Sequence, residues 1–283
     1  MAANELRPLL RLVPTNRVRF HENPEPGRTE RLRKRIERDA LLKNPPIVAE
    51  MDDGHYLLLD GANRVSVFRQ LDYPQIPVQV VDYGDPAVQL KGWHHLLLEG
   101  EGLNLQEAYA NLPGVVMRRL AHKNLRHVLE LREVFAVLVT DEETCWGLYP
   151  EHDEGEIDMR RRIEICEAVV NAYEGQTRLE RVKLADYSLL PEVVGNVAHQ
   201  LCLFPVLHKG EMLHLAAAGV MIPTGLTRHI IPGRALGINL DLTFLTGPGS
   251  EAEKESHFQS IVDGLAMEGR IRFYEESVFI LNE

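Results

Sequence analysis

The stretch LLLDGANRVSVFRQL, residues 57–71, joins an apolar run to an amphipathic segment through an Asp-Gly pair. The apolar run is typical of a buried strand, and after the glycine Val65, Phe68 and Leu71 repeat at helical spacing. A strand that passes directly into a helix places the unpaired N–H groups of the first helical turn at the end of the sheet. The stretch therefore predicts a strand–turn–helix, whose joint either simply turns the chain or binds a phosphate.

The Asp-Gly joint combines groups that suit a phosphate. A strand that ends in Asp60 places a carboxylate at the mouth of the sheet, where α/β folds bind their ligands. Gly61 lets the backbone approach an anion closely, and the amides and dipole of a helix N-terminus favour negative charge. Asn63 and Arg64 add side-chain donors, and an arginine can contact a phosphate through two parallel hydrogen bonds. The structural alternative is that Asp60 caps the helix while Arg64 pairs with a surface carboxylate, and the joint taken alone favours it.

A second group of ionisable residues lies earlier, in the loop FHENPEPGR at residues 20–28. Glu22 leaves a predicted strand into this loop and is a candidate general base, provided that the fold holds it next to a reacting hydroxyl. His21, Glu25 and Arg28 lie within the same few residues. A solvated surface loop explains the same cluster, and spacing alone favours that interpretation.

Two later stretches carry side chains suited to a small polar ligand. In KGWHH, residues 91–95, Trp93 is a candidate wall of a pocket with a neighbouring histidine as a polar contact. A core aromatic beside a surface histidine is the structural alternative. In PTGLTRHIIPGR, residues 223–234, three polar residues follow one another. In chain order they suit a hydroxyl or amine, a carboxylate and a phosphate, as in a binding site. A rigid loop held by internal hydrogen bonds is the structural alternative. These three candidates are Thr227, Arg228 and His229.

Composition excludes several classes of protein. The chain has 283 residues and a net charge of −11, which argues against a broad surface for duplex DNA because DNA phosphates require a basic face. Its three cysteines show no C-x-x-C spacing, so we expect a reduced, cytoplasmic protein. The N-terminus lacks a signal-peptide pattern, and no apolar run approaches the roughly 18 residues of a membrane span. The sequence contains no P-loop, H-E-x-x-H or G-x-S-x-G motif, so phosphate chemistry would use an uncommon scaffold.

Short elements follow one another closely in the N-terminal third and are less clearly marked afterwards. The patterns predict a helix that begins at a capping Thr29, then the strand–turn–helix described above and a strand that closes the unit. Later they predict a buried strand, an amphipathic helix and, at the end, a helix and a strand pair. The predicted strands are 11–14, 17–22, 45–50, 56–60, 76–83, 134–140 and a pair around 270–281, and the predicted helices are 29–42, 61–71, 159–173 and 251–267.

The order of these pieces resembles the ParB/sulfiredoxin fold, in which a short strand pair, a helix, a strand–turn–strand, a D/E-G-x-x-R joint, a second helix and an I-P-V strand follow one another. The resemblance implies an α/β (α+β) chain with a ParB/sulfiredoxin-like nucleotide-binding domain at 1–95. A mixed α/β domain at 96–283 would contribute to the substrate pocket. Sulfiredoxins carry a catalytic cysteine in this turn, where the chain reads GANR, so their activity is excluded.

Within this superfamily the chain is similar to the free L-serine kinases, which include archaeal ADP-dependent enzymes and a bacterial ATP-dependent relative. Those enzymes show H-E after an early strand, D-G-x-H-R at the turn, a tryptophan after the first domain, and K/R-G-E followed by P-x-x-T-R-[HF]. The matching residues occur here in the same order: His21-Glu22, Asp60-Gly61 with Arg64, Trp93, HKGE at 208–211 and IPTGLTRH at 222–229.

The resemblance implies a kinase that converts free L-serine to O-phospho-L-serine, with ATP or ADP as donor and Mg²⁺ as cofactor. Glu22 would accept the proton of the serine hydroxyl, and Asp60 would orient that hydroxyl or the metal. In-line phosphoryl transfer depends on positioning and charge neutralisation, and Gly61, Asn63 and Arg64 would hold the transferred phosphate. Serine would be enclosed by Trp93, Thr227, Arg228 and His229.

Two departures from the family and one alternative function remain. The family histidine in D-G-x-H-R is Asn63 here, which can donate a hydrogen bond but cannot carry a proton or a charge. The segment at 210–225 is longer than in the relatives, which predicts a reshaped pocket. The alternative is a non-enzymatic ParB-like nucleotide-binding transcriptional regulator or partition-type DNA-binding protein, which the acidic charge and the missing helix-turn-helix oppose. We expect no membrane or nucleic-acid partner, and the sequence is compatible with a homodimer.

Overall fold

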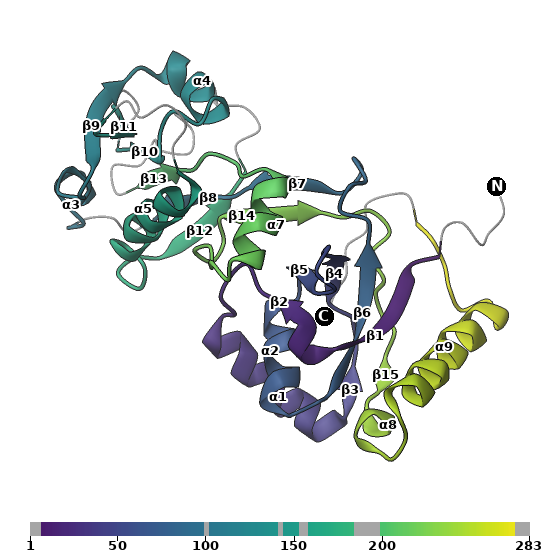
Figure 1. Cartoon of the computed structure of the whole chain (residues 1–283). Coiled ribbons are helices and arrows are strands. Elements are labelled where there is room, and N and C mark those ends of the chain that lie inside the picture. The colour runs from purple at the N-terminus through teal and green to yellow at the C-terminus, as the bar shows by residue number, and fades with distance from the viewer. Residues whose placement is uncertain (1–6, 99–101, 141–143, 153–157, 184–198, 275–283) are drawn as a thin grey trace. The chain divides into compact units, whose positions relative to one another are not determined.

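The computed structural model describes residues 7–98, 102–140, 144–152, 158–183 and 199–274. The chain forms two compact units, of which unit 1 comprises Met1–Gln89 with His229–Glu283 and unit 2 comprises Leu90–Arg228. The boundaries between the units fall within β7 (Gln89–Gly92) and β14 (Thr227–Ile230), two strands that pair with each other (Figure 1). The division into domains at residues 95 and 96 stays a prediction, and each unit is described by itself.

Unit 1 is built on a five-stranded mixed sheet. Its strand β6 lies between β1 and β4, and all of its residues except the last are buried. β4 pairs parallel with β6 and β2 parallel with β5, while the other pairs are antiparallel. The predicted α/β class is therefore confirmed. Across the sheet the order is β1 (Leu9–Pro14), β6 (Gln75–Val81), β4 (Ile47–Glu50), β5 (Tyr56–Asp60) and β2 (Val18–Arg19), and the short helix η1 (Thr15–Arg17) precedes β2.

Two helices, α1 (Pro26–Asp39) and α2 (Ala62–Gln70), pack against each other in unit 1. The prediction that the first helix begins at Thr29 is wrong, because Glu25 occupies the N-cap and Pro26 begins the helix. Proline suits the first position of a helix because its missing N–H would have no partner there. Thr29 is buried, and its hydroxyl donates to Asn63 Oδ1 over 2.9 Å. The helix also ends earlier than predicted, with Ala40 in the left-handed conformation at its C-cap.

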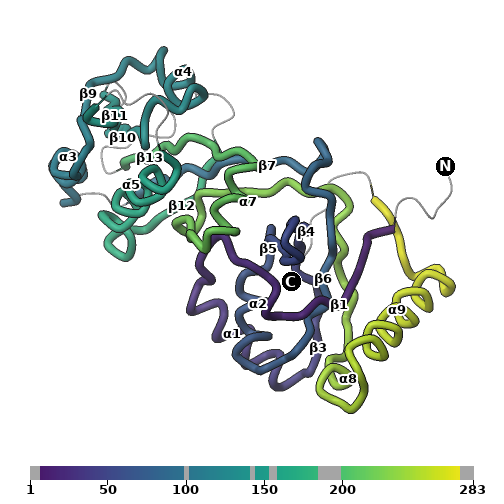
Figure 2. The backbone as a smooth tube through the Cα atoms, in the orientation of Figure 1, coloured from purple at the N-terminus to yellow at the C-terminus, as the bar shows by residue number. Residues whose placement is uncertain are grey.

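The C-terminal part of the chain returns to unit 1. Strand β15 (Leu240–Asp241) pairs with β3 (Leu41–Leu42), and α8 (Thr243–Thr246) and α9 (Glu251–Met267) follow. Figure 2 shows α9, in yellow, alongside the purple strand β1. Of the predicted strand pair around 270–281, residues 275–283 lie outside the described residues, and 270–274 form no strand.

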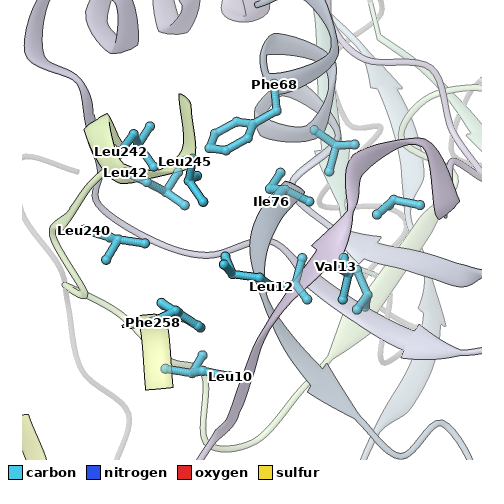
Figure 3. Close-up of a cluster of buried hydrophobic side chains, with 14 of the residues drawn as sticks. Leu10, Leu12, Val13, Leu42, Phe68, Ile76, Leu240, Leu242, Leu245 and Phe258 are labelled. Atoms are coloured by element: carbon cyan, nitrogen blue, oxygen red, sulfur yellow. The ribbon is translucent and has the colours of Figure 1, made fainter. Parts of the chain in front are cut away.

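Side chains of α9 complete the exposed edge of β1. The backbone N–H of Leu12 donates to Glu255 Oε2 over 2.7 Å, and Gln259 Nε2 donates to the carbonyl of Leu10 over 2.8 Å. An edge strand otherwise offers these groups to another chain. Figure 3 shows the core beneath, where Phe258 of α9 lies among leucines of β1 and of the C-terminal segment. The returning segment is therefore part of the core of unit 1.

Unit 2 contains a six-stranded antiparallel sheet in the order β12-β8-β13-β10-β11-β9. All residues of β10 are buried, and the predicted strand at 134–140 and helix at 159–173 are confirmed as β10 and α5. Its elements are β8 (His94–Leu97), α3 (Leu105–Ala110), β9 (Val115–Leu120), η2 (His122–Asn124), α4 (Leu125–Glu130), β10 (Ala136–Val139), β11 (Cys145–Pro150), α5 (Met159–Asn171), β12 (Leu179–Val182), β13 (Gln200–Leu203) and α7 (Lys209–Ala217).

A search of the described residues for a helix long and apolar enough to cross a bilayer finds none. All three cysteines are buried and form no disulfide.

Truncating Phe258 tests whether α9 is an integral part of unit 1. The ring is completely buried, so Phe258→Ala should lower the free energy of unfolding by about 3–5 kcal/mol through lost burial and a residual cavity. Urea unfolding followed by circular dichroism measures this change. Met267→Ala, at the exposed end of the same helix, is the matched control and should change it by less than about 0.5 kcal/mol. Equal stability of the two variants would show that α9 does not stabilise the unit.

Candidate active site

The carboxylate of Asp60 connects three segments of unit 1. Asp60 ends β5, and its Oδ2 accepts a hydrogen bond from Arg64 Nη2 on α2 over 3.0 Å and one from Arg234 Nη2 of the C-terminal segment. The N-cap of α2 is Gly61, and it makes no side-chain hydrogen bond. The structural alternative in which Asp60 caps the helix is therefore wrong. The first turn of α2 keeps backbone donors that an anion can use.

Gly61 has the backbone conformation that the turn requires. Its φ is +105°, a region that side chains with a Cβ rarely adopt. A Cβ at this position would lie 2.9 Å from Pro46 Cβ and 3.0 Å from Arg64 Nε. The turn is therefore packed tightly from both sides, and glycine is needed on steric grounds as well as for close approach of a ligand.

Arg64 donates chiefly to the protein itself. Its Nη1 donates to the carbonyls of Asn44 and Pro45 over 3.0 and 2.8 Å, in addition to the bond from Nη2 to Asp60. The side chain is 21% exposed and holds the segment before β4 against the turn. Its predicted role as a phosphate ligand stays a prediction, and these hydrogen bonds show an additional structural role.

Asn63 ties the turn to the loop that carries Glu22. Its Oδ1 accepts from the backbone N–H of Glu25 and from the hydroxyl of Thr29, both over 2.9 Å. These bonds leave the amide Nδ2, which can donate two hydrogen bonds. As a result, the residue that departs from the family pattern positions the neighbouring loop, and its predicted phosphate contact would have to come from Nδ2.

Glu22 lies beside a buried histidine. Its side chain is 16% exposed, and its Oε1 lies 3.9 Å from Nε2 of His21. The Nδ1–H of His21 donates to the carbonyl of Leu58 in β5 over 2.6 Å. Burial lowers the pKa of His21, and the nearby Glu22 carboxylate opposes this shift. His21 therefore anchors the Glu22 loop to the strand that ends in Asp60.

His229 approaches the same region of unit 1. Its ring lies edge-on to His21, with centroids 5.5 Å apart, and its Nε2 lies 2.9 Å from the hydroxyl of Tyr83. Burial raises the pKa of Tyr83, so this phenol stays protonated near neutral pH. His21 is thus in contact with both Glu22 and His229 in unit 1. Tyr83, which contacts His229, and Arg234, which contacts Asp60, were not predicted as site residues.

Unit 2 holds the remaining predicted residues. The guanidinium of Arg228 lies 5.0 Å from the ring centroid of Trp93, and Lys183 Nζ lies 5.5 Å from it. The backbone N–H of Trp93 donates to the carbonyl of Leu226 over 3.0 Å. Thr227 lines a pocket of this unit together with apolar side chains. Trp93, Thr227 and Arg228 therefore come together, while their membership of one site with the residues of unit 1 stays a prediction.

The two histidines after Trp93 are core residues and not pocket contacts. His95 Nε2 donates to the carbonyl of Gly225 over 3.0 Å, and its Nδ1 lies 2.7 Å from the hydroxyl of Tyr173. His94 Nδ1 accepts from the backbone N–H of Phe204 over 3.2 Å. Burial lowers the pKa of each imidazole to about 4. Both rings are therefore neutral at physiological pH.

The magnesium ion that the resemblance implies stays a prediction. Mg²⁺ in nucleotide enzymes takes phosphate oxygens and water, with one or two carboxylates from the protein. Within the described ranges, no group of three or more His, Cys, Asp or Glu side chains is placed to hold a metal ion. The candidate for a protein ligand is the carboxylate of Asp60, which directly precedes the first turn of α2.

The buried histidines make the stability of the protein dependent on pH. The unfolded chain binds protons on them near pH 6.5, whereas the folded chain binds them only near pH 4. We expect the melting temperature to fall as the pH is lowered from 6.5 to 4, with a loss of about 3 kcal/mol from one such histidine. In His95→Gln, whose amide also donates, this fall should be shallower. The control His214→Gln removes an exposed histidine of α7, and equal pH profiles for both variants would contradict the assignment.

Comparison with known proteins identifies relatives across nearly the whole chain, although no family model matches it. The chain is 25% identical over 284 residues to the ATP-dependent L-serine kinase SbnI of Staphylococcus aureus, with 99% of this chain and 100% of that protein covered. An ATP-dependent L-serine kinase of Staphylothermus marinus is 24% identical over 225 residues, which cover 78% of this chain and 85% of the relative.

Solved structures agree with these relatives. A C-terminally truncated SbnI from Staphylococcus aureus matches with a TM-score of 0.73 at 24% identity, over 92% of this chain and 97% of that chain. A free serine kinase in complex with AMP matches with a TM-score of 0.65 at 17% identity, over 83% of this chain and 93% of the other. The chain therefore has the fold of the free serine kinases, and its resemblance to these enzymes is confirmed.

Proposed function

We propose that the protein is an ATP-dependent L-serine kinase, which transfers the γ-phosphoryl group of ATP to the hydroxyl of free L-serine. The similarity to named L-serine kinases over nearly the full length supports this reaction. The observation that carries the proposal is the first turn of α2, which has no side-chain cap and lies directly after the carboxylate of Asp60. This turn offers backbone donors and a helix dipole to a phosphate group.

Glu22 is the proposed general base. The serine hydroxyl attacks the γ-phosphorus, an O–P bond forms while the bond to the β–γ bridging oxygen breaks, and the hydroxyl proton passes to the Glu22 carboxylate. A carboxylate suits this task if it lies within hydrogen-bond reach of the hydroxyl. The 16% exposure of Glu22 and the bond from His21 to β5 support a fixed position for it.

The other roles belong to the same proposal. Asp60 orients the hydroxyl or a Mg²⁺ ion, and the metal, when bound with the nucleotide, neutralises charge that develops on the phosphate oxygens. Gly61 and Asn63 hold the transferred phosphate. For serine, Arg228 has the guanidinium that suits a carboxylate, and Trp93, Thr227 and His229 complete the recognition set.

A coupled assay of ATP consumption tests the reaction. With free L-serine we expect ADP and O-phospho-L-serine in equal amounts, and with homoserine or threonine a lower kcat/KM, because the reacting hydroxyl is displaced by an added methylene or methyl group. ADP replaces ATP in a parallel series to identify the donor. If serine does not accelerate the consumption of either nucleotide, the kinase proposal is wrong.

Exchange of one carboxylate tests the general base. Glu22→Gln keeps the shape of the side chain but cannot accept a proton, and we expect kcat to fall by about 10²–10⁴-fold. Affinity for ATP, measured by calorimetry, should change little, because the variant alters proton transfer and not phosphate binding. Glu25→Gln in the same loop is the control, since that carboxylate is exposed and pairs with Arg28, and its kcat should stay within about twofold. Retention of wild-type kcat in Glu22→Gln would exclude Glu22 as the base.

A further inference from the structure

Arg234 lies on the C-terminal segment of unit 1 and contacts the same carboxylate oxygen as Arg64. Its Nη2 donates to Asp60 Oδ2, and its side chain is 41% exposed. Two guanidinium groups therefore share one carboxylate, which leaves an excess of positive charge next to the first turn of α2. Such an excess attracts an anion, because a phosphate offers more negative charge and more acceptor oxygens than a carboxylate does.

The two arginines differ in how many of their donors the protein uses. Arg64 donates to two carbonyls as well as to Asp60, which occupies three of its five N–H groups. Among the described residues, Asp60 is the one hydrogen-bond partner of Arg234. No other acceptor among the described residues takes its remaining donors, so Arg234 can donate to a ligand, whereas most donors of Arg64 are already in use.

A buried glutamine fixes the backbone on both sides of Arg234. Gln79 is 3% exposed and lies on β6, the strand between β1 and β4. Its Nε2 donates to the carbonyl of Gly233 over 3.0 Å, and its Oε1 accepts from the N–H of Ala235 over 2.8 Å. A buried amide whose two ends are both satisfied resists displacement, because leaving either end unpaired costs free energy. The residue between these two contacts is Arg234.

We propose that Arg234 is the arginine that contacts the phosphates of the nucleotide, that Gln79 is its positioning residue, and that Arg64 holds the turn. The inference rests on the proposed function and adds to it a residue outside the strand–turn–helix. Without nucleotide, Arg234 pairs with Asp60. With nucleotide, its guanidinium turns to the phosphate oxygens and balances the charge that builds up as the phosphoryl group is transferred. Arg234 neither gains nor loses a proton in this step.

Binding measurements test the contact without depending on turnover. We expect Arg234→Ala to weaken binding of a non-hydrolysable ATP analogue at least about 10-fold and to lower kcat/KM for ATP by about 100-fold. Affinity for adenosine, which has no phosphate, should be unchanged. Arg234→Lys retains the charge but not the planar fork and should restore part of both losses. Arg270→Ala is the control, because this exposed arginine of the same segment pairs locally with Glu268, and its affinity for the analogue should be unchanged.

A double-mutant cycle tests the positioning role of Gln79. Gln79→Leu keeps the volume but removes both backbone contacts, so affinity for the ATP analogue should fall about 5- to 10-fold while the melting temperature shows that the protein remains folded. In the Arg234→Ala background the same change should have no further effect on this affinity, because it acts through Arg234. Additive losses would show that Gln79 acts on binding by another route.

Other outcomes separate this inference from the proposed function. Wild-type affinity of Arg234→Ala for the ATP analogue, or equal weakening of adenosine and of the analogue, overturns the phosphate contact. Loss of analogue binding in a folded Arg64→Ala variant, with Arg234→Ala unaffected, assigns the contact to Arg64 instead. If the wild-type protein binds the analogue in the expected way but phosphorylates no serine, the inference stands and the kinase proposal fails.

Discussion

The carboxylate of Asp60 holds together parts of the chain that lie far apart in the sequence. It ends β5, accepts from Arg64 on the following helix, and accepts from Arg234, which lies 174 residues further along the chain. Through Arg64 the same group is linked to the carbonyls that precede β4. The joint between strand and helix is therefore fixed by long-range contacts. This fixed position is what a phosphate site needs, because preorganised donors do not have to rearrange when charge develops.

The turn between β5 and α2 is also linked to the loop that carries Glu22. Asn63 accepts from the backbone of Glu25 and from Thr29, and His21 donates to the strand that ends in Asp60. The loop that carries the proposed base is thus attached to the turn that carries the proposed phosphate site. An amide at position 63 accepts two hydrogen bonds through one oxygen and keeps two donors. The exchange of the family histidine for Asn63 is therefore compatible with an ordered site, although it removes a group that could carry a proton.

Local patterns predicted most of the elements of unit 1 because each strand or helix is bounded by its own turn residues. Asp60-Gly61, for example, marks the end of β5 and the start of α2 within one residue. The start of α1 was missed because Thr29 resembles an N-cap, whereas Pro26 determines where the helix begins. The packing of the C-terminal segment on unit 1 could not be predicted from any short stretch of sequence, because β15 and α9 contact the unit through tertiary packing. Arg234 was missed as a site residue for the same reason, although the polar Gln79 between two valines of β6 was a signal that a buried partner existed.

A crystal structure of the protein with a non-hydrolysable ATP analogue and L-serine would show which arginine contacts the phosphates and where the serine hydroxyl lies. We expect phosphate oxygens on the first-turn amides of α2 and on the guanidinium of Arg234. Arg64 should still donate to the carbonyls of Asn44 and Pro45, and the serine hydroxyl should lie within hydrogen-bond reach of Glu22. Phosphates bound elsewhere, or an Arg64 that has left those carbonyls for the phosphates while Arg234 remains on Asp60, would contradict this expectation.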